Sequence, residues 1–352
     1  MFCATAAGLA LVTSGLVAPR TASAARPVRS GRPTYFTISG GLGAVAALSA
    51  KNAWAVGSGT PGTLILHWDG TTWKRVPSPV RGAGSSLGGV ALVSARNAWA
   101  VGSTLAGQTV ILHWDGSTWK RVPSPSPAPR NFISGVAATS ARNAWAVGFT
   151  VRSGRYATLI LHWNGMAWKR VPSPSPGAGS QLYAVAATSA GNAWATGISP
   201  GSTLILHWNG TAWKRQASPS PPGGGNLAGV AATSARSAWA VGYGDGKNLI
   251  ERWNGATWKQ VPGPSPAGSI LGGVTAGSAA STWAVGCLGG KTLIVHWNGT
   301  GWKQVRSPNP TPGHGECLGG IAATSAGSAW AVGYAAGGGE GLIAGWNGVS
   351  WK

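Results

Sequence analysis

Acidic side chains are scarce in this sequence, which has only 6 Asp and Glu residues among 352. Enzymes that hydrolyse glycosidic bonds generally need two facing carboxylates. Only Asp69 and Asp115 share a position in the repeat described below, and Asn replaces them in its other copies. A turn tolerates that exchange, whereas a catalytic carboxylate does not. We therefore expect no enzymatic activity.

Long apolar runs are also missing outside the N-terminus, so we expect no transmembrane segment. Residues 1–24 are apolar and small up to Ala18, and Ala22-Ser23-Ala24 fits a signal-peptide cleavage site. The usual preceding basic residues are absent, so the leader can begin upstream; an unstructured Ala-rich tail is the alternative. We expect a secreted or cell-surface protein, from a bacterial envelope.

Tryptophan, by contrast, is abundant and periodic. The 21 tryptophans form three sets of seven, spaced roughly every 45 residues. One set stands in Ala-Trp-Ala or Thr-Trp-Ala, one precedes Asp-Gly or Asn-Gly, and one precedes Lys. The first set is Trp54, Trp99, Trp145, Trp194, Trp239, Trp283 and Trp330. No tryptophan is left over for a separate site.

Each repeat contains four short β-rich segments bounded by Gly, Asn, Ser or Pro. The Asp-Gly or Asn-Gly after the third segment is a strong hairpin signal, and the Pro-Ser-Pro after the fourth ends the sheet. Seven four-stranded units predict an all-β, seven-bladed β-propeller rather than a β-solenoid. The blades should begin near residues Leu42, Leu87, Ile133, Leu182, Leu227, Leu271 and Leu318.

The unit resembles a kelch repeat in its aromatic second strand ending in Gly and the Trp that opens its fourth strand. It has one Gly where kelch repeats have two, as at Gly57 and Gly148. The turn from Asp69 to Trp73 is similar to the Asp-box of sialidase-like propellers, but one residue shorter. The resemblance covers residues 42–352 and implies the architecture, while propellers host unrelated functions.

Residues 25–41 form a basic N-terminal segment with one β-rich stretch, Tyr35 to Ile38. The last blade ends early, at Trp351-Lys352. We expect Tyr35 to Ile38 to pair with that blade and close the ring, which would remove an open sheet edge. A chain truncated at its end is the alternative.

The loops between second and third strands vary most between blades, and binding residues often lie on loops held by a rigid scaffold. The longest, 149–157, belongs to blade 3. It predicts a ligand site formed by aromatic and arginine side chains; a solvated loop without a ligand is the alternative. The candidate residues are Arg130, Phe132, Phe149, Arg152, Arg155, Tyr156 and Tyr183.

The formal net charge is +21, and much of it repeats with the blades. Lys-Arg pairs open outer strands, and cations recur in the first-to-second turns. We expect both sets to form a basic rim on the face with invariant turns. Such a rim attracts polyanions; a merely solubilising rim is the alternative. No nucleic-acid-binding module is recognisable, so specific nucleic-acid binding is not expected.

One histidine recurs at one position in five blades, which spreads these residues around the ring and predicts packing instead of a metal site. We expect no metal and no cofactor. The recurring residues are His67, His113, His162, His207 and His296. Cys287 and Cys317 map to one face of neighbouring blades. In an exported protein they predict a disulfide, with two free thiols as the alternative.

Together these features predict a secreted, non-catalytic, monomeric module that recognises a cell-envelope polysaccharide or a protein through its variable loops. One alternative is a structural or adhesion propeller that its basic rim holds to an anionic envelope polymer. A lower-ranked alternative is a degenerate sialidase-like hydrolase. Salt should weaken attachment through the rim far more than binding at an aromatic site.

Overall fold

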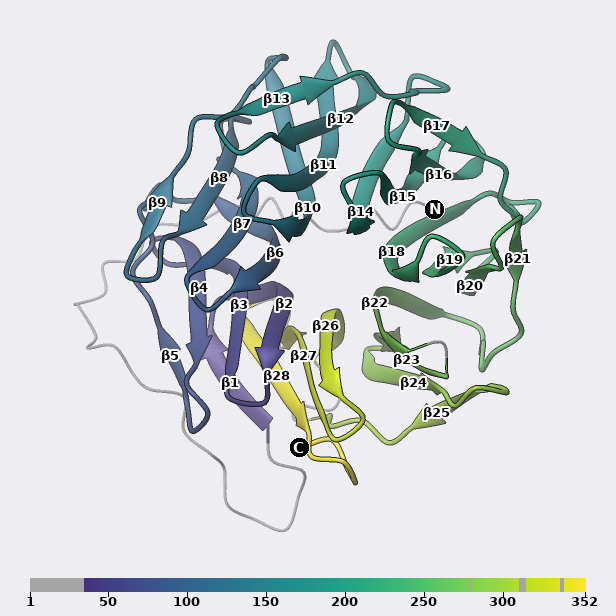
Figure 1. Ribbon diagram of the computed structural model, residues 1–352. Coiled ribbons are helices and arrows are strands. Elements are labelled where there is room, and N and C mark those ends of the chain that lie inside the picture. The colour runs from purple at the N-terminus through teal and green to yellow at the C-terminus, as the bar shows by residue number, and fades with distance from the viewer. Residues whose placement is uncertain (1–34, 279, 310–314, 336–338) are drawn as a thin grey trace.

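Every regular element in the described part of the chain is a β-strand. This computed structural model describes residues 35–278, 280–309, 315–335 and 339–352. The expected signal peptide at 1–24 and the basic residues 25–34 lie outside the described residues. The strands form seven sheets of four antiparallel strands, arranged as a ring around a central axis (Figure 1). The predicted seven-bladed β-propeller is therefore confirmed.

Each blade runs outward from an axial strand to a peripheral one. The innermost strands are β2 (Gly41–Ser49), β6 (Ser86–Ser94), β10 (Arg130–Ser140), β14 (Gln181–Ser189), β18 (Gly225–Ser234), β22 (Ser269–Ser278) and β26 (Cys317–Ser325). The second strands are β3 (Asn52–Gly59), β7 (Asn97–Ser103), β11 (Asn143–Arg152), β15 (Asn192–Ser199), β19 (Ser237–Gly244), β23 (Ser281–Leu288) and β27 (Ser328–Ala335).

The third strands are β4 (Gly62–Trp68), β8 (Thr109–Trp114), β12 (Arg155–Trp163), β16 (Ser202–Trp208), β20 (Lys247–Trp253), β24 (Lys291–Trp297) and β28 (Glu340–Trp346). The outer strands are short in six blades: β5 (Trp73–Arg75), β9 (Trp119–Arg121), β13 (Trp168–Val171), β17 (Trp213–Gln216), β21 (Trp258–Gln260) and β25 (Trp302–Val305). Prolines follow these strands in most blades and end the ladder.

Blade 7 combines the two ends of the chain. Its outer strand is β1 (Tyr35–Ser39), which pairs antiparallel with β28 from Tyr35↔Ala344 to Ser39↔Glu340. The Phe36 ring lies 6.1 Å from the Trp68 ring of blade 1 and 6.5 Å from Trp330 of blade 7. The strand therefore covers the edge of β28 and also contacts the first blade.

The interior between blades is built from the three tryptophan sets. Trp54 in blade 1 lies 4.8 Å from the ring of Trp114 and 5.2 Å from Trp119 in blade 2, the latter edge-on at 85°. Trp330 of blade 7 makes the same two contacts with blade 1, at 4.7 Å to Trp68 and 5.1 Å to Trp73. Since a packed tryptophan buries about 150–250 Å², these contacts fill the space that small Ala and Gly residues leave between sheets.

The interface between blades 4 and 5 departs from this apolar pattern. Val147 of blade 3 and Leu206 of blade 4 belong to one buried apolar cluster. One blade further, the same repeat positions hold Thr196 and Glu251, both with 0% exposure. Among the described residues, neither the Thr196 Oγ1 nor the Glu251 carboxylate oxygens have a hydrogen-bond partner. Burial without a partner raises the pKa of Glu251 to about 8.

The buried carboxyl predicts a pH-dependent stability. Between its ordinary pKa of 4.5 and about 8, folded Glu251 keeps a proton that the unfolded chain releases. The free energy of unfolding should therefore fall as pH rises through this range, by at most about 5 kcal/mol. Glu251→Leu should remove this fall and raise the free energy of unfolding at pH 8, measured by guanidinium titration from pH 5 to 8.

The exposed Glu340 supplies the matched control. Glu340→Gln removes a carboxyl of the same type from a solvated position and should leave the pH dependence as it is in the parent protein. If Glu251→Leu and Glu340→Gln alter the pH profile equally, Glu251 does not titrate as a buried group.

Candidate functional site

The two faces of the ring carry different kinds of connection. The invariant face holds the turns between first and second strands and between third and fourth strands. The variable face holds the second-to-third connections and the segments that join blades. The connections of the variable face differ from blade to blade, and loops on a rigid scaffold commonly carry binding residues.

The invariant turns are held by a side-chain oxygen. Asp69 Oδ1 accepts hydrogen bonds from the backbone N–H groups of Thr71 and Thr72 at 2.9 and 3.0 Å. Lys74 Nζ lies 2.7 Å from Asp69 Oδ2, and this pairing, with the turn hydrogen bonds, holds the pKa of Asp69 well below its usual range. Asn164 makes the same backbone contacts in blade 3. The Asp and Asn residues here therefore shape turns, which explains their exchange between blades.

The recurring histidines also contribute to blade structure. His67 lies 4.4 Å from the ring of Trp54, and its Nε2 is 3.2 Å from Asn52 Oδ1. The pKa of His67 is lowered, mainly because its ring is partly buried. The described residues contain no group of three or more His, Cys, Asp or Glu side chains that could hold a metal ion. No helix in the described part of the chain is long and apolar enough to cross a membrane.

The connection expected as a long loop in blade 3 is instead a β-hairpin. β11 continues to Arg152 and β12 begins at Arg155, and only Ser153 and Gly154 form the turn. Their φ angles are 48° and 74°, as in the two-residue turns that match strand twist. The prediction of a loop over 149–157 is therefore wrong. A Ser-Gly pair between β-forming residues was the signal that could have revealed the hairpin.

This hairpin brings four of the seven candidate residues together. Phe132 of β10 lies directly opposite Phe149 of β11, with their rings stacked at 5.0 Å. The Tyr156 ring of β12 is 5.8 Å from Phe149, and the Arg130 guanidinium carbon is 5.4 Å from the centre of the Phe132 ring. We call Arg130, Phe132, Phe149 and Tyr156 the blade 3 platform.

The other three candidates lie apart from this platform. Arg152 belongs to the opposite side of the sheet, and its Nη2 donates to the Pro127 carbonyl at 3.3 Å. Arg155 is exposed at the end of the hairpin. Tyr183 lies on the innermost strand of blade 4, where its hydroxyl donates to Gln181 Oε1 at 3.3 Å.

The platform is fixed by contacts on both sides of its hairpin. Toward blade 2, Asn131 Nδ2 donates to the carbonyls of Gly107 at 3.0 Å and Ala128 at 2.7 Å. Toward blade 4, the Tyr156 N–H donates to the Ala178 carbonyl at 3.2 Å. The platform residues are half-buried or exposed, with Tyr156 at 37% exposure. The aromatic surface is therefore held in place before any ligand arrives.

The basic residues do not form one rim. The lysines of the first two Lys-Arg pairs, Lys74 and Lys120, bind acidic turn residues on the invariant face. The following arginines extend toward the variable face. Arg75 Nη2 donates to the Thr60 carbonyl at 3.3 Å, and Arg121 Nη2 donates to the Thr109 carbonyl at 3.2 Å. The expectation that both cations lie near the invariant face is wrong, because these long arginine side chains extend along the blade to backbone carbonyls at its variable end.

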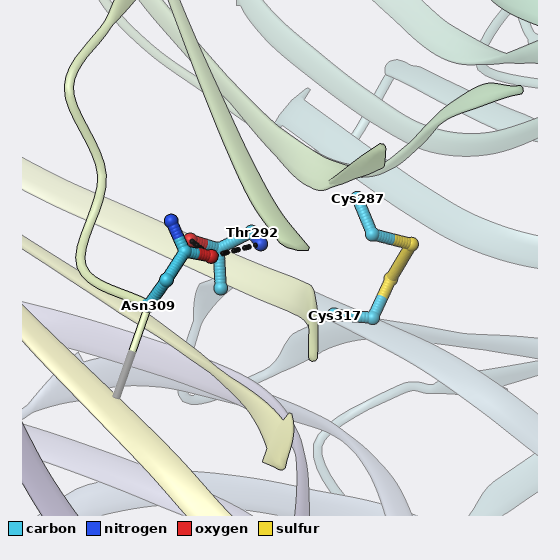
Figure 2. The surroundings of a disulfide bond; sticks show 4 residues. All are labelled: Cys287, Thr292, Asn309 and Cys317. Atoms are coloured by element: carbon cyan, nitrogen blue, oxygen red, sulfur yellow. Dashed lines mark hydrogen bonds between the residues drawn. A yellow bond between two sulfur atoms is a disulfide. The ribbon is translucent and has the colours of Figure 1, made fainter. Parts of the chain in front are cut away.

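Cys287 and Cys317 form a disulfide on the variable face (Figure 2). The bond links the end of β23 in blade 6 to the start of β26 in blade 7, with the Cα atoms 4.7 Å apart. Beside it, Asn309 Oδ1 accepts hydrogen bonds from the backbone N–H and the hydroxyl of Thr292 at 2.7 and 3.1 Å. The disulfide therefore joins blade 6 to blade 7, and the Asn309 hydrogen bonds hold the segment that leaves blade 6 against β24.

Comparison with known proteins identifies the architecture and nothing finer. No protein-family description and no curated protein matches the chain. Among solved structures, it is similar to YCF48 bound to a D1 peptide, with 16% identity, a TM-score of 0.61, and 92% of this chain and 98% of the other covered. It is also similar to the RRP9 WD40 repeats, with 12% identity, a TM-score of 0.61, and coverage of 91% and 96%.

A third similar structure is a lectin from Aleuria aurantia in complex with a fucosyl-GlcNAc disaccharide. It has 18% identity and a TM-score of 0.50, and the match covers 75% of this chain and 93% of the lectin. At these identities the likeness shows the β-propeller fold alone. The similar structures include one protein in complex with a peptide and one in complex with a sugar.

The disulfide gives a stability prediction. Replacing both cysteines by serine should lower the free energy of unfolding by about 3–4 kcal/mol, because the bond closes a loop across a sequence separation of 30 residues. Guanidinium titration of parent and variant measures the difference. Alkylation without reductant, followed by peptide mapping, should leave Cys287 and Cys317 unmodified in the parent. Labelling of both would contradict the disulfide.

Proposed function

We propose that this protein is an exported, non-catalytic binding module that recognises a polysaccharide or a protein with its variable face. The blade 3 platform carries this proposal. Among the described connections of the variable face, it is the one that adds stacked aromatic rings and an adjacent arginine, half-buried or exposed and held by neighbouring blades. The kelch-like and Asp-box-like features describe the blade sequence and add no ligand to this proposal.

Two physical features of the platform suit a ligand. Aromatic side chains provide a large contact area with little conformational entropy to lose, and Arg130 adds a charged donor beside Phe132. The short hairpin turn and the hydrogen bonds of Asn131 and Tyr156 limit rearrangement on binding. The side chains of the platform are therefore already ordered in the free protein, so binding a ligand costs little further conformational entropy.

The alternative is attachment to an anionic envelope polymer through charge alone, without the platform. Lys169, Lys214, Lys259 and Lys303 favour it, because Asn replaces the acidic partner of Lys74 and Lys120 in those blades. These lysines are exposed, so salt should screen their attraction strongly. The two candidate functions therefore separate by ionic strength.

The test is binding of the purified protein to a panel of isolated envelope polysaccharides and envelope proteins, at low and high salt. Replacing residues 149–157 by the shorter blade 4 connection, 198–202, removes the hairpin extension. A double variant, Phe149→Ala with Tyr156→Ala, removes only the rings. We expect each to weaken binding at least tenfold, a loss of about 1.4 kcal/mol, and binding of the parent to persist at high salt.

Met166→Ala is the control, because Met166 is exposed on the invariant face and should leave binding unchanged. Binding that disappears at high salt and ignores both hairpin variants would reject the platform. The charge-based alternative would then stand.

A further inference from the structure

Charge is distributed unevenly over the variable face. All six acidic residues lie in the described part of the chain, and none is on the variable side of blades 1 to 3. Asp69 and Asp115 lie in turns of the invariant face, and the other four belong to blades 5 to 7 and their connections. The variable side of blades 1 to 3 carries exposed arginines, among them Arg75, Arg81, Arg121, Arg130, Arg152 and Arg155. We call these six residues the arginine arc.

Two open surface pockets within this arc share the lining residue Arg121, and we call the two together the groove. Each pocket has a volume of about 380 Å³. One is lined by Gln108 and the hydroxyl-bearing residues Ser124 and Ser126. The other is lined by Arg81, Leu105 and residues of the connector between blades 1 and 2. The groove therefore offers two guanidinium groups and several polar groups to one ligand.

The groove adjoins the blade 3 platform. Its second cavity includes Thr104 to Ala106 of blade 2, and the next residue in this turn, Gly107, accepts a hydrogen bond from the Asn131 N–H at 2.8 Å. A side chain at Gly107 would lie within 2.9 Å of the Arg130 Cβ. Arg130 in turn lies over Phe132. Cavities, arginines and aromatic rings thus form one continuous path from blade 1 to blade 3.

We propose that this path binds an extended polysaccharide that carries carboxylates, with arginines of the arc pairing with its carboxylates and the platform contacting a sugar ring. The inference rests on the proposed function, since it places the ligand on the same face. Arginine suits carboxylates because its planar guanidinium donates two parallel hydrogen bonds. The absence of acidic residues on this part of the described face leaves the attraction unopposed.

Other polyanions fit the path less well. Single-stranded nucleic acids need aromatic side chains along the length of the groove, on which successive bases stack. The aromatic rings of this path are confined to the platform at one end, and none lines either cavity. Protein interfaces are enriched in aromatic and other apolar residues at their centre. Along this part of the described surface the exposed large apolar side chains are Leu105 and Tyr156. Sugar hydroxyls instead match the Ser, Thr and Gln lining of the groove.

The experiment uses polygalacturonate and alginate as probes, and methyl-esterified polygalacturonate as the neutral form of the same polymer. Binding to the full mature protein is measured by calorimetry at 150 mM salt. We expect a carboxylated probe to bind at least tenfold more tightly than the esterified one. Arg81→Gln with Arg121→Gln should weaken that binding at least tenfold, and should reduce the difference between acid and ester forms.

The matched control removes equal charge elsewhere. Arg215 holds in blade 4 the repeat position that Arg121 holds in blade 2, and Arg236 lies in a turn of the invariant face. Arg215→Gln with Arg236→Gln should change binding less than twofold. Thermal unfolding of every variant verifies that the fold is retained.

Several results would overturn the inference. One is equal binding of the acid and ester forms of polygalacturonate, and another is an equal loss of affinity in the two double variants. Failure of both carboxylated polymers to bind would also overturn it. So would binding of polyglutamate or single-stranded DNA at least as tight as that of the polysaccharides. The proposed function has its own readout. If the Phe149→Ala, Tyr156→Ala variant still loses binding to another polysaccharide or protein, the platform stands while the carboxylate-binding path fails.

Discussion

The ring depends on one contact that recurs at every blade interface. A tryptophan from the second strand of one blade packs against two tryptophans of the next. One of these ends the third strand, and the other opens the outer strand or, in blade 7, is Trp351, which bridges to Trp346 outside the named strands. Trp145 illustrates it, at 4.8 Å from Trp208 and 5.1 Å from Trp213. Around these rings, aliphatic side chains of both sheets, such as Val56, Ile65 and Leu112, complete the buried cluster. Each blade therefore buries much of its apolar surface only against its neighbours. The seventh interface, from Trp330 to Trp68 and Trp73, makes the arrangement circular.

Closure places a second demand on the chain. Blade 7 takes its outer strand from Tyr35–Ser39, while the other three strands come from the opposite end of the sequence. The Cys287–Cys317 disulfide links this composite blade to blade 6 on one side, and Phe36 contacts Trp68 of blade 1 on the other. The composite blade is therefore tied to both neighbours by contacts absent from the general repeat.

With the ring held in this way, the connections on the variable face can differ between blades without changing the scaffold. Turns on the invariant face are constrained, since Asp69 or Asn164 must accept backbone hydrogen bonds there. Blade 3 instead lengthens its second and third strands without disturbing the tryptophan contacts, and so carries aromatic rings beyond the common blade. Glu251 shows the opposite case, in which a polar residue enters the shared interior and becomes a protonated, poorly accommodated group at neutral pH.

The repeat in the sequence determined the number of blades, the order of strands within them and the regular placement of the tryptophans, because each feature follows from local periodicity. It also identified the aromatic and arginine residues of blade 3 as unusual. Only the tertiary structure decided that residues 149–157 form a hairpin, and that Arg75 and Arg121 extend toward the variable face while Lys74 and Lys120 bind acidic turn residues. The physical reason is that strand pairing, and the end of the blade to which a long side chain extends, depend on register and on contacts with neighbouring elements, which local periodicity does not specify.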